Sequence, residues 1–196
     1  MTATSTPELR VEEAATNTTE VLEKRIALLE KRLEQVPDPD SLNLLIFSGD
    51  RDRLLAALVL ATGAAACGMN VSMFFTFWAT LALRDGGPQI GKKSIVERAF
   101  GWMLPRSAAR TPLSQMDMCG MGRFLMTREM QKKNIADVDE LFATAGELGV
   151  KVRVCEMSMQ LMGIRREELI DYPNLDYCGV ATFAEQTSQS NTTLFI

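Results

Sequence analysis

The side chains best suited to chemistry in this 196-residue chain are four widely spaced cysteines, Cys67, Cys119, Cys155 and Cys178. Their spacing contains no Cys-x-x-Cys pair and does not match a zinc site. The chain has no histidine, which excludes Ser-His and Cys-His catalysis and removes the commonest metal ligand. The Gly-rich spacings of dinucleotide and P-loop sites are missing too. We therefore expect no metal and no cofactor. The chemistry left is that of a thiolate, the nucleophilic form of cysteine.

Cys155 has the most favourable position for a reactive thiol. It ends a predicted buried strand, 150–155, and a short predicted helix, 156–162, follows it. Reacting groups collect at the carboxyl ends of strands in open α/β sheets. The N–H groups at the amino end of the following helix favour the thiolate. Cys155 is therefore the first candidate for a nucleophile, with packing in the core as the alternative.

The other three cysteines have weaker positions. Cys119 precedes a predicted helix that ends near Lys133, and two nearby glycines permit close approach, so it is the second candidate. Cys67 ends an Ala-rich helix and Cys178 begins a predicted strand. Because free cysteine is among the most buried residue types, we expect both to be in the core.

The elements that position these thiols alternate between strands and helices, which predicts an α/β fold with a mostly parallel sheet and helices on both faces. A predicted helix at 51–66 follows the first strand, and Thr182 is predicted to cap a helix that ends near Gln189. The five predicted strands are 42–47, 71–77, 150–155, 178–181 and 192–196.

The chain divides into three predicted regions. Residues 1–18 are expected to be a disordered tail, 19–40 an amphipathic helix and linker, and 41–196 an α/β domain. The helix has an apolar seam at heptad spacing, which fits either packing on its own domain or oligomerisation. The seam residues are Leu22, Ile26, Leu29 and Leu33.

Leu54–Leu83 contains no charged residue and resembles a membrane segment. Gly68 and Asn70 divide it into pieces shorter than the roughly 20 residues a spanning helix needs. We interpret it as a buried helix, a turn and a buried strand, with membrane attachment as a less favoured alternative. With no secretion signal, reduced thiols in the cytoplasm are expected.

The net charge of −4 argues against general nucleic-acid binding. Positive charge is nevertheless concentrated in residues 84–133, where ten basic residues accompany four acidic ones. This segment includes an irregular stretch at 86–117, which is typical of a functional loop. The excess of basic residues in 84–133 predicts either a solvated face or an electropositive wall that binds a small anion or an acidic partner.

Three segments resemble proteins of the DsrE/DsrF-like superfamily, including a group often labelled "peroxiredoxin family". They are Val154–Asp171, Gly179–Ile196 and Gly68–Trp78, and the resemblance extends from about Leu42 to Ile196. The peroxidatic Thr-x-x-x-Cys pattern is absent, so the sequence does not support peroxidase chemistry.

The resemblance implies a three-layer α/β/α fold and a homo- or hetero-oligomer. It further implies a sulfur carrier or sulfurtransferase component that holds sulfane sulfur as a persulfide or thiosulfonate, and it favours a carrier over a turnover enzyme. The family cysteine corresponds to Cys155, and Cys119 corresponds to a second cysteine of some members. The implied partners are rhodanese-like and TusA-like sulfur transferases and small sulfur anions such as thiosulfate or polysulfide. The alternative is an oligomeric interaction or scaffold protein with inert thiols.

Overall fold

The computed structural model describes residues 7–33, 36–87, 107 and 111–196. They belong to two units that divide between Pro37 and Asp38. The first unit contains helix α1 (Pro7–Leu33). This helix is longer than expected, because it includes residues 7–18, which we predicted to be disordered. Pro7 occupies the first helical position, where its missing N–H costs nothing, and Ala and Glu favour the helix that follows.

The second unit is built on a five-stranded, all-parallel sheet, which confirms the predicted fold class. The strands lie in the order β4-β3-β2-β1-β5. Their bounds are β1 (Asp38–Ile46), β2 (Asn70–Phe75), β3 (Lys151–Cys155), β4 (Leu175–Cys178) and β5 (Ser190–Phe195). The inner strands are rich in buried apolar side chains, as expected for a sheet covered on both faces.

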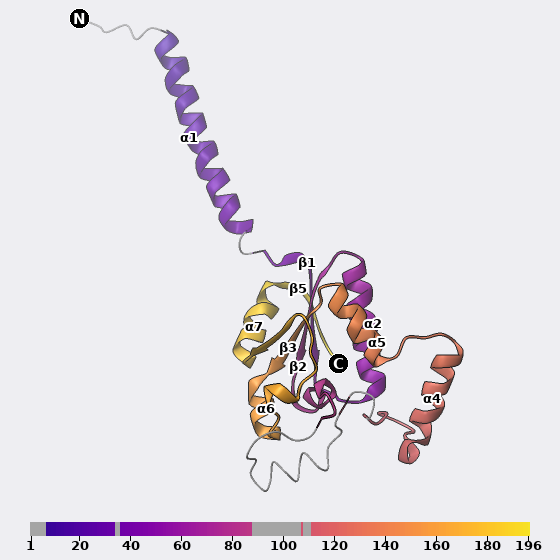
Figure 1. The fold of residues 1–196 in the computed structure, drawn as a ribbon. Coiled ribbons are helices and arrows are strands. Elements are labelled where there is room, and N and C mark those ends of the chain that lie inside the picture. Colours follow the sequence, from indigo (N-terminus) through magenta and orange to yellow (C-terminus); the bar gives the residue numbers. More distant parts are fainter. Residues whose placement is uncertain (1–6, 34–35, 88–106, 108–110) are drawn as a thin grey trace, which may run out of the picture. The chain divides into compact units, whose positions relative to one another are not determined.

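Helices cover both faces of the sheet and give the three layers. Figure 1 shows α2 (Arg51–Ala66) and α5 (Val138–Glu147) on one face, and α6 (Glu156–Met162) and α7 (Val180–Gln189) on the other. Helix α4 (Met121–Lys132) lies beyond α2 and α5. The N-cap residue Asp137 forms a full capping box with Glu140, which fixes where α5 begins. The described part of this unit also contains the 3₁₀ turns η1 (Phe77–Leu83), η3 (Met118–Gly120) and η4 (Arg166–Glu168).

The uncharged segment 54–83 contains the predicted helix and strand as α2 and β2, and it ends in the turn η1. In the described part of the chain, none of the helices is both long and apolar enough to cross a bilayer. Most of the predicted irregular segment 86–117 lies outside the described residues.

Two local predictions near the carboxyl terminus are wrong. The fourth strand is Leu175–Cys178 rather than 178–181, so Cys178 ends the strand instead of beginning it. Helix α7 begins after Gly179, and Thr182 lies inside the helix instead of capping it. The apolar residues that follow Cys178 are compatible with either a strand or a helix. The turn at Pro173 and Asn174 is the signal that marks the true start of the strand.

Candidate functional site

Cys155 lies at the carboxyl end of β3 and is the N-cap residue of α6. Its backbone is extended, with φ −68° and ψ 112°, so the chain turns from strand to helix at the cysteine itself. The residue is 0% exposed. The predicted strand-to-helix position of Cys155 is therefore observed, and the thiol is enclosed by protein at that junction.

A chain of hydroxyl groups lies against this thiol. The Oγ atoms of Thr76 and Ser158 are 3.0 Å apart, and both residues are buried. Ser158 Oγ also accepts the N–H of Phe77 at 2.9 Å, which fixes the position of the hydroxyl. The hydroxyl groups of Thr76 and Ser158 can therefore donate to each other and to the sulfur of Cys155.

Two opposing effects act on the Cys155 thiol, and the pKa falls below its ordinary value. Burial alone raises the pKa, since it disfavours the thiolate. Hydrogen bonds from the Ser158 hydroxyl and N–H outweigh burial, together with those from the Thr76 hydroxyl and the Met157 N–H. The two backbone donors belong to the first turn of α6, where helix N–H groups have no partner within the helix. The site therefore favours a sheltered thiolate.

Cys178 is the cysteine that the structure brings next to Cys155. The two residues are register partners at the carboxyl ends of the parallel strands β3 and β4. Cys178 is partly exposed, so the prediction that it belongs to the core is wrong. Burial raises the pKa of its thiol, the guanidinium of Arg153 lowers it, and negative charge at Cys155, Asp176 and Glu156 raises it further. The overall pKa shift of Cys178 is upward, opposite to that of Cys155.

A side-chain bridge connects the residues beside the two cysteines. Arg166 donates to the carboxylate of Glu156, with 2.7 Å between Nη2 and Oε1, and its guanidinium lies 4.2 Å from the ring centroid of Tyr177. Glu156 follows Cys155 and Tyr177 precedes Cys178 in the chain. The contacts join the start of α6 to the end of β4 and so hold the two strand ends together.

Cys119 lies in a separate place. It is exposed, in the η3 turn before α4, with a left-handed backbone at φ 58°. Gly122 makes the tight turn possible, because a Cβ there would lie 2.0 Å from the carbonyl oxygen of Met116. The predicted position before a helix is correct, but α4 and α6 lie on opposite sides of the sheet (Figure 1). The structure therefore does not bring Cys119 to Cys155.

Cys67 follows the last residue of α2 and is exposed, which makes the prediction that it is buried wrong. The Ala-rich helix suggested burial throughout, but only one side of α2 packs on the sheet and its last turn reaches solvent. This thiol makes a useful control, because it is free and lies outside the candidate site.

The described residues include five of the ten basic residues of the predicted electropositive wall. Arg84 is buried with Glu168, at 3.6 Å between Nη2 and Oε2. Arg123 donates to the carbonyl oxygen of Thr111 at 3.3 Å. An anion-binding role for this segment stays a prediction.

The sequence pattern did not single out Ser158 and Thr76. Ser158 has a local signal, since a serine three residues after an N-cap faces back towards it in the first helical turn. Thr76 has none, because it reaches the site only through the pairing of β2 with β3. The meeting of Cys155 with Cys178 likewise depends on strand pairing.

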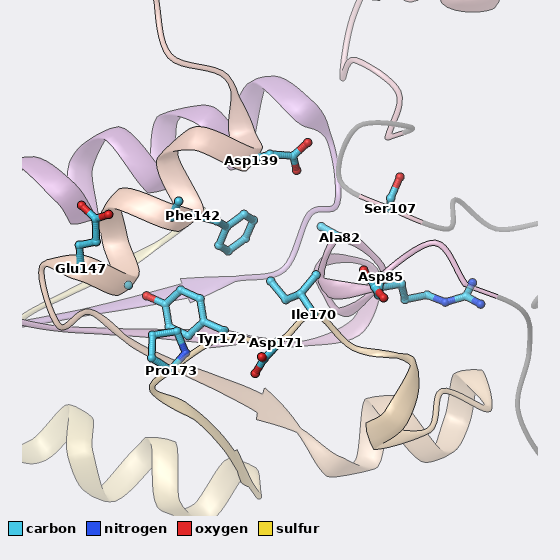
Figure 2. Close-up of a pocket in the computed structure, with 13 residues that line it drawn as sticks. Ala82, Asp85, Ser107, Asp139, Phe142, Glu147, Ile170, Asp171, Tyr172 and Pro173 are labelled. Atoms are coloured by element: carbon cyan, nitrogen blue, oxygen red, sulfur yellow. The ribbon is translucent and has the colours of Figure 1, made fainter.

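A cavity of about 570 Å³ lies away from the thiols, between α5 and the segment that leads into β4. Figure 2 shows Phe142, Ile170 and Tyr172 in it, with the carboxylates of Asp85 and Asp139 near its margin. Burial and the neighbouring Asp137 raise the pKa of Asp139, while Arg51 lowers it. No cysteine of the described residues lines this cavity.

Comparisons with known proteins identify the family of this chain. The sequence profile of the DsrE/DsrF/DrsH-like family matches residues 39–195. The chain belongs to this family. Among its relatives is the uncharacterized protein YrkE of Bacillus subtilis (strain 168), which is 39% identical over 153 residues, covering 78% of this chain and 94% of YrkE.

A second relative is the sulfur carrier protein DsrE2 of Allochromatium vinosum, which is 28% identical over 167 residues, covering 79% of this chain and 97% of DsrE2. Among solved structures, the YchN protein of E. coli matches with a TM-score of 0.42 and 13% identity, covering 80% of this chain and 99% of YchN. Membership in the DsrE/DsrF/DrsH-like family agrees with the resemblance noted in the sequence, and the family profile covers all but the first and last residues of the second unit.

Proposed function

We propose that this protein is a sulfur carrier in which Cys155 takes up sulfane sulfur and passes it on to a protein acceptor. The observation that carries the proposal is the enclosed Cys155 thiol, whose pKa is lowered by hydrogen bonds from Ser158, Thr76 and the first turn of α6. The relative in Allochromatium vinosum that is named a sulfur carrier supports it.

The chemistry needs no oxidant or cofactor. The Cys155 thiolate attacks the terminal sulfur of a polysulfide and forms a new S–S bond. The adjacent S–S bond breaks, and its electron pair leaves with the shortened polysulfide. The cysteine then holds a persulfide, which the surrounding protein protects from bulk oxidants. A protein that stores the product in this way acts as a carrier rather than as a turnover enzyme.

Cys119 enters the proposal as a second acceptor. Its exposed turn suits exchange with another protein, and its place before α4, away from α6, favours a separate role over direct transfer from Cys155 within one subunit. We propose rhodanese-like and TusA-like sulfur transferases as partners, thiosulfate or polysulfide as the small-molecule source, the cytoplasm as the location and a homo-oligomer as the working form.

Intact-mass measurement after treatment with inorganic polysulfide tests the main residue. We expect sulfur adducts on the wild type and on Cys67→Ser, which removes an exposed thiol outside the site. We expect Cys155→Ser to lose most of the uptake. If Cys155→Ser takes up as much sulfur as the wild type, Cys155 is not the carrying residue.

A second candidate function, an oligomeric interaction or scaffold protein with inert thiols, is favoured by exposed apolar side chains on two helices. On α1 they are the four seam residues, which are 52–70% exposed. Around α4 they are Met116, Met118, Met121, Phe124 and Leu125. Slow, unselective alkylation of all four cysteines at neutral pH would favour this candidate over the sulfur carrier.

A further inference from the structure

The arrangement of Cys155 and Cys178 places two thiols side by side on one face of the sheet. Register partners in adjacent parallel strands lie about 4.8 Å apart and point to the same face. Arg153, two residues before Cys155, shares that face and donates to Ser72 Oγ at 2.8 Å and to the Gln186 side chain of α7. Both cysteines therefore lie on the α6 and α7 side.

The two thiols differ in access. Cys155 is on an inner strand and is fully enclosed, whereas Cys178 is on β4, the edge strand, and is partly exposed. A sulfane sulfur on Cys155 is well protected, but at 0% exposure Cys155 offers no surface for the thiol of a protein acceptor to contact. Cys178 is the thiol next to Cys155 that such an acceptor can touch.

We propose that Cys178 is the relay thiol that receives the sulfane sulfur from Cys155 and presents it to the acceptor. The inference rests on the proposed function as a sulfur carrier. The thiolate of Cys178 attacks the outer sulfur of the Cys155 persulfide, one S–S bond forms, and the bond to Cys155 Sγ breaks. Cys155 leaves as the thiolate, and the proton of the Cys178 thiol goes to solvent. One persulfide replaces another, with no net oxidation.

The opposite pKa shifts of the two thiols favour exchange in this direction. A thiol with a lower pKa leaves faster, and one with a higher pKa is the stronger nucleophile once deprotonated. The hydrogen bonds from Ser158 and Thr76 stabilise Cys155 as the departing thiolate. Sulfur is therefore favoured on Cys178, the more accessible position.

The test follows the sulfur by peptide mass spectrometry. Polysulfide-loaded wild-type protein is freed of excess reagent, sampled over time, alkylated and digested with trypsin. Cleavage after Arg153, Arg165 and Arg166 places Cys155 and Cys178 on different peptides. We expect sulfane sulfur first on the Cys155 peptide and then on the Cys178 peptide, and the signal on both should fall when glutathione is added as acceptor.

Two variants separate the relay from the carrier function. We expect loaded Cys178→Ser to transfer sulfur to glutathione at least about tenfold more slowly than the wild type, because a step between positioned neighbours is lost. Cys67→Ser should transfer at the wild-type rate. In Cys155→Ser, the Cys178 peptide should stay unlabelled.

Several results would overturn the relay. Transfer by Cys178→Ser at the wild-type rate would show that the acceptor reaches Cys155 without it. Equal labelling of Cys178 in Cys155→Ser would show that its sulfur comes directly from solution. A Cys155–Cys178 disulfide with release of sulfide, in place of a labelled Cys178, would show attack on the inner sulfur. Normal uptake on Cys155 in any of these cases leaves the carrier function standing, whereas loss of uptake on wild-type Cys155 refutes that function itself.

Discussion

Replacing Ser158 with alanine should make Cys155 much less reactive at neutral pH. The Ser158 hydroxyl is part of the buried chain that stabilises the Cys155 thiolate, and a hydrogen bond to a charged group contributes about 1.5–3 kcal/mol. Since about 1.4 kcal/mol corresponds to a tenfold change in an equilibrium constant, the thiolate-to-thiol ratio at fixed pH should fall by about tenfold to a hundredfold. The pKa of Cys155 should rise accordingly.

The assay is the rate of alkylation as a function of pH, in a background where the other three cysteines are serine. The parent should reach its maximal rate at a lower pH than the Ser158→Ala variant. Thr76→Val, which keeps the side-chain shape and leaves the Ser158 hydroxyl in place, should shift the profile less. Thr80→Val is the matched control, because the buried Thr80 hydroxyl has no hydrogen-bond partner among the described residues and should leave the profile unchanged.

Loss of the Ser158 hydroxyl also removes the acceptor of the Phe77 N–H, which should cost about 1–3 kcal/mol of folding free energy. Thermal unfolding identifies a variant that stays folded in the assay. If folded Ser158→Ala gives the same pH–rate profile as the parent, the hydroxyl does not stabilise the thiolate and the reasoning about Cys155 is refuted.

Three other predictions test the frame around the site. Glu168→Ala should lower the free energy of unfolding by about 3–5 kcal/mol, because it removes the carboxylate that faces the buried guanidinium of Arg84; an unchanged denaturant midpoint would contradict this. Gly122→Ala should lower the unfolding temperature, since its Cβ meets backbone, whereas Gly63→Ala in α2, with open space around its Cβ, should raise or keep it; equal behaviour of the two would refute the close contact. Burial raises the pKa of Tyr172 to about 12, so the free energy of unfolding should fall by at most about 2–3 kcal/mol as the pH rises from about 10 to about 12. Tyr172→Phe should remove this pH-dependent loss of stability. The same dependence of stability on pH in Tyr172→Phe would contradict the prediction.

The elements that the sequence predicted well are those with strong local signals. Helices α2 and α6 have the predicted bounds. A long uncharged run rich in Ala and Leu defines α2, and Gly163, with a left-handed backbone at φ 64°, ends α6. The bounds of β4 were wrong because it is an edge strand with a mixed burial pattern, so alternation along it is weak. The start of α1 was missed because composition alone does not separate a helical from a disordered polar segment.

The residues of the candidate site likewise differ in whether local sequence could reveal them. Cys155 was predictable because a strand, a cysteine and a short helix with a glycine end lie within one continuous segment. Thr76 and Cys178 come from other strands, and only the pairing of β2, β3 and β4 brings them to it. A prediction that ranks each cysteine by its own neighbours in sequence cannot find such a pair.

The register between β3 and β4 is therefore the feature on which the relay depends. Side chains alternate between faces along a strand, so a shift of one residue would turn Cys178 to the opposite face from Cys155. Four consecutive pairs fix the register, from Val152 with Leu175 to Cys155 with Cys178. The bridge from Arg166 to Glu156 and Tyr177 holds the strand ends beyond the last pair. Because β4 is at the edge, the same register that aligns the two thiols also leaves the outer one open to a partner.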